Sequence, residues 1–176
     1  MLEQYIDAAI GRKKAEIVLK NGKFVNVFTG EVCEGDIAIE GGKIVGFGQY
    51  EGEKEYDISG KVAVPGLIDA HVHIESSQLS PEEFAKLILP RGTTTVIADP
   101  HEITNVCGIA GAKYIADASE NTPLEVKVML PSCVPATAFE TSGAILTGAD
   151  TEKYIGEDFI YGLGEFINYP GVIYKD

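Results

Sequence analysis

The spacing of hydrophobic and polar residues changes near residue 60 of the chain. In residues 2–14 the apolar side chains recur at helical spacing, which predicts a short amphipathic helix. From 15 to 60, short apolar runs alternate with turn signals, and Asn21-Gly22 is a strong hairpin signal. The strands expected here are 16–20, 23–28, 36–40, 43–47 and 56–58. We expect residues 1–60 to form the N-terminal helix and part of a small antiparallel β-sandwich domain.

Longer apolar runs alternate with helical segments from residue 61 onward. The run from Val62 to Ile68 is nearly all apolar, as is typical of a strand buried on both faces of a parallel sheet. Ser80-Pro81-Glu82-Glu83 forms a capping box with proline at the first helical position. The remaining expected elements are strands 93–98, 124–130 and 159–163, helices ending near 89, over 107–118 and starting near 150, and a loop at 168–171.

Polar residues gather where each expected strand ends, which is where β/α barrels place their active sites. These residues are His71 and His73, then Asp99, His101 and Glu102, then Ser132 and Cys133, and finally Glu165. Only four strand–helix units are visible, and a closed barrel of this kind has about eight strands. The predicted class is α/β, with residues 61–176 as strands 1–4 of a TIM-like (β/α)8 metal-dependent hydrolase barrel.

His71 and His73 are the first candidate metal ligands. Residues two apart on a strand point to the same face, so both rings can reach one ion. Such a pair also occurs without a metal, and imidazole does not choose between zinc, iron, manganese and nickel. Glu165 ends the fourth strand and, taken alone, is equally an exposed loop acid. Across a barrel mouth from His71 and His73, however, it can bridge two divalent ions that activate a shared water.

Three further residues have a structural and a functional interpretation. His101 either lies in a turn made by Asp99-Pro100 or orients and carries a proton beside a metal site. Glu75 and Ser76 either cap the next helix or hydrogen-bond to a polar heterocyclic substrate. Ser132 and Cys133 have no evident general base beside them, so nucleophilic catalysis is not expected.

Composition narrows the possible partners and compartments. The formal charge of −13 argues against a nucleic-acid or anionic-membrane partner. Three scattered cysteines do not suggest a disulfide framework, and no signal peptide or membrane-spanning run is seen, so we expect a cytoplasmic protein. Four open barrel strands would expose their edges, so self-association or a homo-oligomer is expected.

Several stretches resemble the bacterial and archaeal adenine deaminase family of the amidohydrolase superfamily. The opening motif is VPGLIDAHVH at 64–73, and nearly the whole chain takes part in the resemblance. The longer matching stretches are 17–32, 71–77, 89–108, 129–144 and 162–172.

The resemblance implies deamination of adenine to hypoxanthine and ammonia at a site with two divalent ions, manganese or iron, with zinc also possible. It assigns His71 and His73 as metal ligands and Glu165 as the bridging carboxylate, with a metal-bound hydroxide attacking C6 of the purine. The family's further histidine ligands and its proton-carrying aspartate have no counterpart here. We therefore expect an N-terminal portion that is inactive alone.

Two alternatives to this function remain. One is another amidohydrolase, such as a cyclic amidase acting on hydantoin- or dihydroorotate-like rings. A lysine at the end of the fourth strand would favour that activity, and Glu165 disfavours it. The other is a non-catalytic truncated remnant that keeps the sequence but has lost the chemistry.

Overall fold

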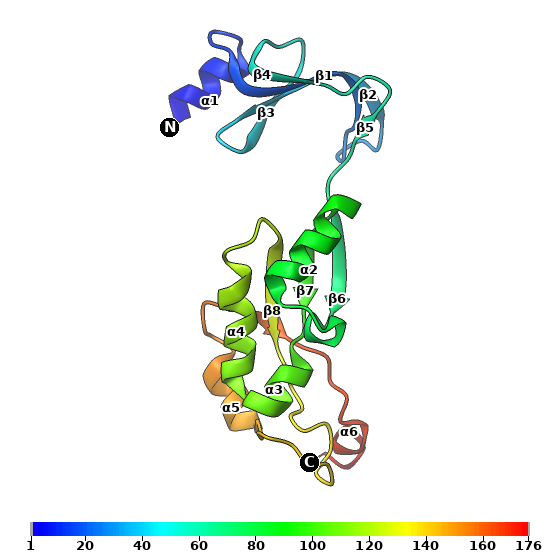
Figure 1. Cartoon of the computed structure of the whole chain (residues 1–176), viewed down its shortest axis with the longest axis vertical. Helices are drawn as coiled ribbons and strands as arrows, with labels where there is room; N and C mark the ends of the chain where they lie inside the picture. The colour runs from blue at the N-terminus through cyan, green and yellow to red at the C-terminus, as the bar shows by residue number, and fades with distance from the viewer. Residues whose placement is uncertain (1, 176) are drawn as a thin grey trace. The chain divides into compact units, whose positions relative to one another are not determined.

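The computed structural model describes residues 2–175, which form two compact units that divide at Pro65–Gly66 (Figure 1). Unit 1 precedes this point and unit 2 follows it. Each unit has its own cluster of buried apolar side chains. The candidate chemistry lies entirely in unit 2.

Unit 1 is a small mixed sheet with one helix, α1 (Leu2–Ala9). Its strands run in the order β3-β2-β1-β4, with β5 also on β1. Strand β1 pairs antiparallel with β2 and parallel with both β4 and β5, so the expectation of a purely antiparallel sheet is wrong. The bounds are β1 (Ala15–Val25), β2 (Val32–Glu40), β3 (Lys43–Gly48), β4 (Gly52–Asp57) and β5 (Val62–Ala63). Its small core contains Ala8, Ala15, Val18 and Ala38.

The expected hairpin at Asn21-Gly22 is wrong. Strand β1 runs straight through these residues, and its pairing with β2 shifts register there. Asn21 has φ +61°, and its backbone N–H donates to Asp36 Oδ1 at 3.1 Å. The same buried carboxylate accepts from Lys20 Nζ at 2.6 Å and from the Tyr50 N–H at 3.1 Å. Asp36 thus stabilises an irregularity within one long strand, where local turn propensity alone predicts a reversal.

Unit 2 is an α/β unit with four parallel strands in the order β6-β7-β8-β9. Helices α2 and α4 lie on one side of this sheet (Figure 1). The strands are β6 (Leu67–Val72), β7 (Thr93–Ala98), β8 (Glu125–Leu130) and β9 (Ile160–Leu163). The helices are α2 (Pro81–Ile88), α3 (His101–Cys107), α4 (Ile109–Ser119), α5 (Gly148–Tyr154) and α6 (Tyr169–Tyr174), with single 3-10 turns at Glu75–Ser77 and Leu89–Arg91.

The core of unit 2 lies between the sheet and its helices. Ile74, Ile115 and Leu130 are among its fully buried side chains. The predicted N-cap of α2 is confirmed, because Ser80 has extended backbone and its hydroxyl accepts from the Glu83 N–H. The full capping box is not formed, since the Glu83 carboxylate pairs with Lys86 and not with the Ser80 N–H.

Three expected elements of unit 2 differ in the structure. The apolar run 62–68 is not one doubly buried strand: its start forms β5 of unit 1, and β6 begins at Leu67 and is largely exposed. The helix expected over 107–118 is α4, and a separate helix, α3, precedes it across Gly108, which has φ +63°. The segment expected as a loop at 168–171 begins helix α6, with Asn168 as its cap.

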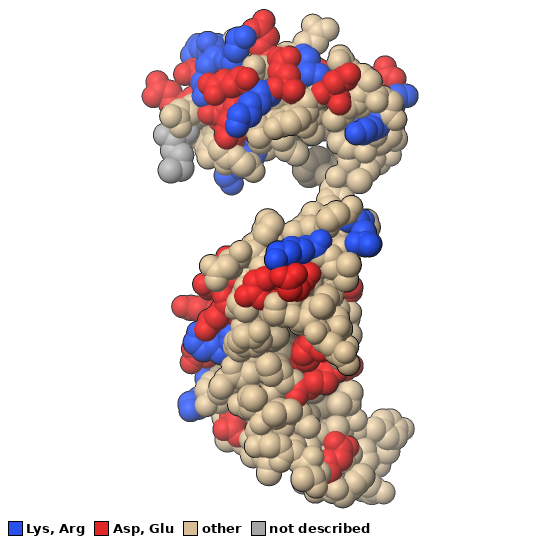
Figure 2. Space-filling view, in the orientation of Figure 1, with Lys and Arg blue, Asp and Glu red and all other residues tan. Residues whose placement is uncertain are grey.

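Charged residues are unevenly distributed over the surface. They crowd the drawn face of unit 1, whereas much of the drawn face of unit 2 is uncharged (Figure 2). Both edge strands of unit 2 carry exposed apolar side chains, including Ile68 at 65% and Tyr161 at 64% exposure. Among the described residues, no helix is long and apolar enough to cross a membrane.

The close packing of α3 against α4 gives the first testable prediction. A Cβ at Gly111 in α4 would come within 2.6 Å of the Ile103 carbonyl oxygen, whereas a Cβ at Gly148 would meet nothing within 4 Å. We expect Gly111→Ala to lower the free energy of unfolding by about 1–3 kcal/mol. Gly148→Ala should raise it by about 0.4–1 kcal/mol. Urea unfolding followed by circular dichroism measures both, and equal effects would contradict this packing.

Candidate metal centre

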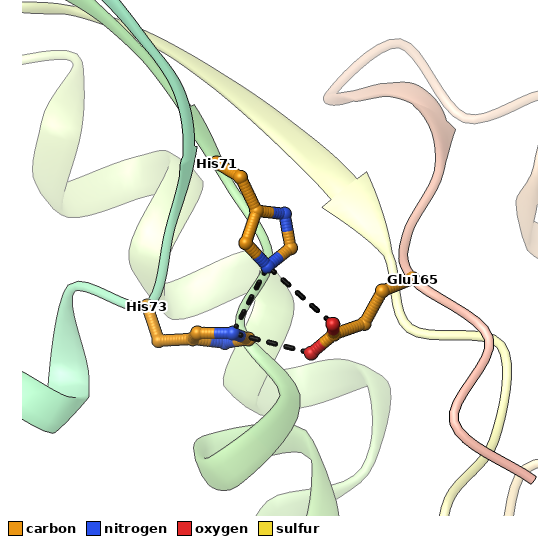
Figure 3. Close-up of side chains that lie close together, drawn as sticks. All are labelled: His71, His73 and Glu165. Carbon is orange, nitrogen blue, oxygen red and sulfur yellow. Dashed lines mark hydrogen bonds and ion pairs between the residues drawn. The ribbon is translucent and has the colours of Figure 1, made fainter.

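Three side chains from the two edges of the unit 2 sheet converge on one point (Figure 3). His71 lies in β6, His73 follows that strand, and Glu165 follows β9. The two histidine Nε2 atoms are 3.2 Å apart. Glu165 places Oε2 3.6 Å from His71 Nε2 and Oε1 3.2 Å from His73 Nε2. The sheet therefore brings together the three residues that the sequence analysis assigned as metal ligands.

The surroundings of His73 determine which ring nitrogen is free. His73 Nδ1 lies 2.6 Å from the backbone carbonyl oxygen of Asp99 and 3.3 Å from Glu102 Oε2. Both neighbours are acceptors, so Nδ1 carries the proton and donates. His73 Nε2 then has a free lone pair directed at His71 and Glu165. Metal-binding histidines commonly have their second nitrogen held by a carbonyl or carboxylate in this way.

The distances within this cluster fit a metal ion. Two ligands that each lie about 2.1 Å from one ion are separated by about 3–3.4 Å in tetrahedral or octahedral geometry. The His71–His73 nitrogen distance of 3.2 Å falls in this range, and so does the 3.2 Å from His73 to Glu165. The 3.6 Å from His71 to Glu165 is slightly longer. Because each carboxylate oxygen faces a different histidine, Glu165 can chelate one ion or bridge two.

His101 lies beside this cluster at the first position of α3, and not in a turn. The structure buries it and places its Nδ1 2.6 Å from Asp99 Oδ1 and 4.0 Å from Glu165 Oε1. Burial acts to lower the pKa of His101, but the contacts with Asp99 and Cys133 outweigh burial and raise this pKa to about 9. The imidazole is therefore protonated at neutral pH, and it faces the Glu165 carboxylate.

Glu75 and Ser76 form the outer part of the site. Glu75 Oε1 accepts from the Ile103 N–H in the first turn of α3, at 3.2 Å, and Ser76 Oγ donates to Glu102 Oε1 at 2.5 Å. Burial raises the pKa of Glu75, and the adjacent Glu102 charge raises it further. Burial also acts to raise the pKa of Glu102, but the Ser76 hydroxyl and the nearby His73 bring it below its usual range. Both predicted substrate contacts thus lie next to Glu102: Ser76 hydrogen-bonds to it, and Glu75 interacts with its charge.

A cleft of about 230 Å³ opens beside the cluster. His73, His101 and Glu165 line it together with Glu102 and Cys133, which the sequence analysis placed at the strand ends. The remaining lining residues, which the sequence analysis did not select, are Asn105, Ala136, Glu140 and Ile167. Asn105 and Glu140 carried no motif or spacing signal, and only the packing of α3 against the segment after β8 makes them neighbours. Cys133 lies 3.7 Å from His101 Nε2.

Comparisons with known proteins agree with this arrangement. The profile of the amidohydrolase family matches residues 62–171. An adenine deaminase from Clostridium acetobutylicum is 54% identical over 99% of this chain, and one from Geobacillus kaustophilus is 53% identical over 97%. The chain spans only 31% and 30% of the lengths of these two curated relatives.

A solved structure supports the fold. Zinc-bound atrazine chlorohydrolase from Arthrobacter aurescens superposes on 83% of this chain and 39% of its own, with a TM-score of 0.54 and 16% identity. At this identity the likeness concerns the fold alone. Because the family profile covers more than half of the chain, including the strands that hold His71, His73 and Glu165, this chain belongs to the metal-dependent amidohydrolase family.

Proposed function

We propose that the chain contributes the first part of the active site of an adenine deaminase, which converts adenine and water to hypoxanthine and ammonia. The observation that carries this proposal is the convergence of His71, His73 and Glu165 within metal-binding distance. The identity of about one half to curated adenine deaminases selects the reaction within the family. Since the chain spans about a third of those enzymes, we infer that it is inactive alone.

The proposed cofactor is a pair of divalent ions, manganese or iron, with zinc also possible. His71 and His73 would hold one ion, and the two oxygens of Glu165 would allow it to bridge to a second. Imidazole and carboxylate together suit all three metals, so the donor set alone does not select among them. A pair of such ions supplies a hydroxide nucleophile at neutral pH when bound.

The residues around the ions have distinct proposed roles. Glu165 would hold the ions, which supply the nucleophile, through its carboxylate, which faces both histidines. Protonated His101, 4.0 Å from Glu165, is placed to orient the nucleophile by hydrogen bonding and to pass a proton within the cleft. Both are the proposed catalytic residues of this chain.

The proposed substrate position is the cleft beside the cluster. It combines hydrogen-bonding side chains with the apolar Ala136 and Ile167, a combination that suits a flat polar heterocycle. Glu75 and Ser76 remain proposed contributors to substrate binding. In the described structure both residues lie next to Glu102, which lines the cleft, and Ser76 hydrogen-bonds to Glu102 directly.

The fold supports a further structural proposal. We infer that unit 2 comprises the first four β/α units of a TIM-like barrel and that unit 1 is part of a small β-sandwich domain. Four parallel strands in sequential order, with helices on one side, support the barrel. The uncovered edges of β6 and β9 then favour self-association of this chain as a homo-oligomer.

Metal binding tests the cluster directly. We expect the chain to bind Zn²⁺ or Mn²⁺, and His71→Ala combined with His73→Ala to abolish the bound metal, because both nitrogen ligands are lost. Isothermal titration calorimetry and elemental analysis after dialysis measure this. A matched control is Cys107→Ala. It removes an exposed thiol, a side chain type that can bind metal, outside the cluster of His71, His73 and Glu165. Unchanged metal content in the double variant would refute the site.

Deaminase activity tests the reaction. We expect no ammonia release from adenine by the 176-residue chain with Mn²⁺ or Fe²⁺. A chimaera that continues this chain with the remaining sequence of the Clostridium acetobutylicum enzyme should deaminate adenine. In that chimaera, Glu165→Gln should lower kcat at least a hundredfold, because an amide cannot bridge two ions as a carboxylate does. Activity of the chain alone would contradict the partial-site proposal, and a folded, metal-loaded but inactive chimaera would contradict the adenine assignment.

Self-association is tested by a charge on the exposed edge strand. We expect concentration-dependent oligomers, and Ile68→Lys should weaken association at least tenfold, because a lysine disfavours pairing at a sheet edge. Ile10→Lys is the matched control, since Ile10 is 56% exposed and lies outside the strands of both sheets. Sedimentation velocity over a range of concentrations measures the effect. A purely monomeric chain, or equal effects of both variants, would rule out association through this edge.

A further inference from the structure

Asp99 is a fully buried carboxylate at the centre of the site. It directly follows β7, between the strands that carry the histidines and Glu165, and its exposure is 0%. A buried carboxylate is costly unless its charge and lone pairs are satisfied. Among the described residues, no lysine or arginine forms an ion pair with Asp99. Its partners belong instead to the candidate metal centre.

One carboxylate oxygen of Asp99 fixes the backbone at Glu165. Asp99 Oδ2 accepts from the Glu165 N–H at 2.7 Å, a contact between residues 66 positions apart. The preceding Gly164 lies so close that any Cβ there would overlap the Asp99 carboxylate. The chain after β9 therefore packs against Asp99, and this contact fixes the backbone position of Glu165.

The other oxygen and the main chain of Asp99 reach two histidines. Asp99 Oδ1 lies 2.6 Å from His101 Nδ1, within ion-pair distance of the ring. The backbone carbonyl of Asp99 accepts from His73 Nδ1 at 2.6 Å. One residue thus contacts His73, His101 and Glu165, which come from three different parts of the chain.

We propose that Asp99 is a positioning residue whose carboxylate sets both the backbone of Glu165 and the position of the His101 ring. The inference rests on the proposed function for the use made of those two residues, but the positioning itself is a property of this chain. The contact with His73 uses the backbone, so substitution of the Asp99 side chain should leave His73 unchanged. This separates the side-chain role of Asp99 from a general loss of structure.

Two substitutions divide the role of the carboxylate. Asp99→Asn keeps the shape and an acceptor oxygen for the Glu165 N–H, but directs an NH₂ group at His101 Nδ1, where a second donor is not tolerated. Asp99→Ala removes both contacts and leaves the Glu165 N–H without its acceptor. Asp117→Asn makes the same chemical change at an exposed carboxylate in α4 and serves as the matched control.

The first measurement is the nitrogen NMR spectrum of the imidazole rings in the metal-free chain. The chain has three histidines, so the signals can be assigned with single histidine substitutions. We expect Asp99→Asn to shift the His101 Nδ1 signal, because the charged partner 2.6 Å away is lost, while the His73 signals and the control variant keep the original pattern. An unchanged His101 Nδ1 signal in folded Asp99→Asn protein would overturn the proposal.

The second measurement is the affinity for Zn²⁺ by calorimetry. We expect Asp99→Ala to bind zinc about 10–100-fold more weakly, the range typical for lost supporting contacts around a metal site. Asp99→Asn should stay within about threefold of the unsubstituted chain, because Glu165 keeps its backbone contact. Equal affinity of folded Asp99→Ala protein would overturn the proposed hold on Glu165. If the unsubstituted chain binds no zinc, the metal proposal fails, and the nitrogen NMR measurement still decides the role of Asp99 at His101.

Discussion

The contact between the carboxyl ends of β6 and β9 is the constraint on which the site depends. These are the two outer strands of the parallel sheet, with β7 and β8 between them. Even so, Glu165 after β9 reaches both histidines that β6 presents. Such an approach requires the sheet to curve, which parallel sheets do when each strand twists relative to its neighbour. Without that curvature His71 and Glu165 would lie on opposite edges of the unit.

The curvature also allows a residue from an inner strand to contact the residues around the candidate metal centre. Asp99 follows β7, an inner strand, and its two carboxylate oxygens contact His101 and the backbone of Glu165. The Glu165 backbone N–H donates to Asp99 Oδ2, and Asp99 Oδ1 lies 2.6 Å from the His101 ring, so both oxygens of the buried carboxylate face a polar partner. The Asp99 carboxylate is therefore buried, and the His101 imidazolium lies beside it. The cluster of His71, His73 and Glu165 adjoins the cleft.

The surface of unit 2 is consistent with the family to which the chain belongs. Apolar side chains on β6 and β9 remain exposed. Strands with this composition are normally buried on both faces. The curated relatives are about three times as long as this chain, so these surfaces suit further contacts with protein.

The sequence by itself determined the α/β class, the cap of α2 and the pairing of His71 with His73 as candidate ligands, because strand periodicity and cap chemistry are local. His71 and His73 are two residues apart, so one strand suffices to place them together. Only the tertiary structure decided the rest. Asn21-Gly22 is an irregularity and not a turn because Asp36, distant in sequence, binds its backbone. The role of Asp99 and the cleft residues Asn105 and Glu140 depend on packing between segments far apart in the chain, which no local pattern encodes.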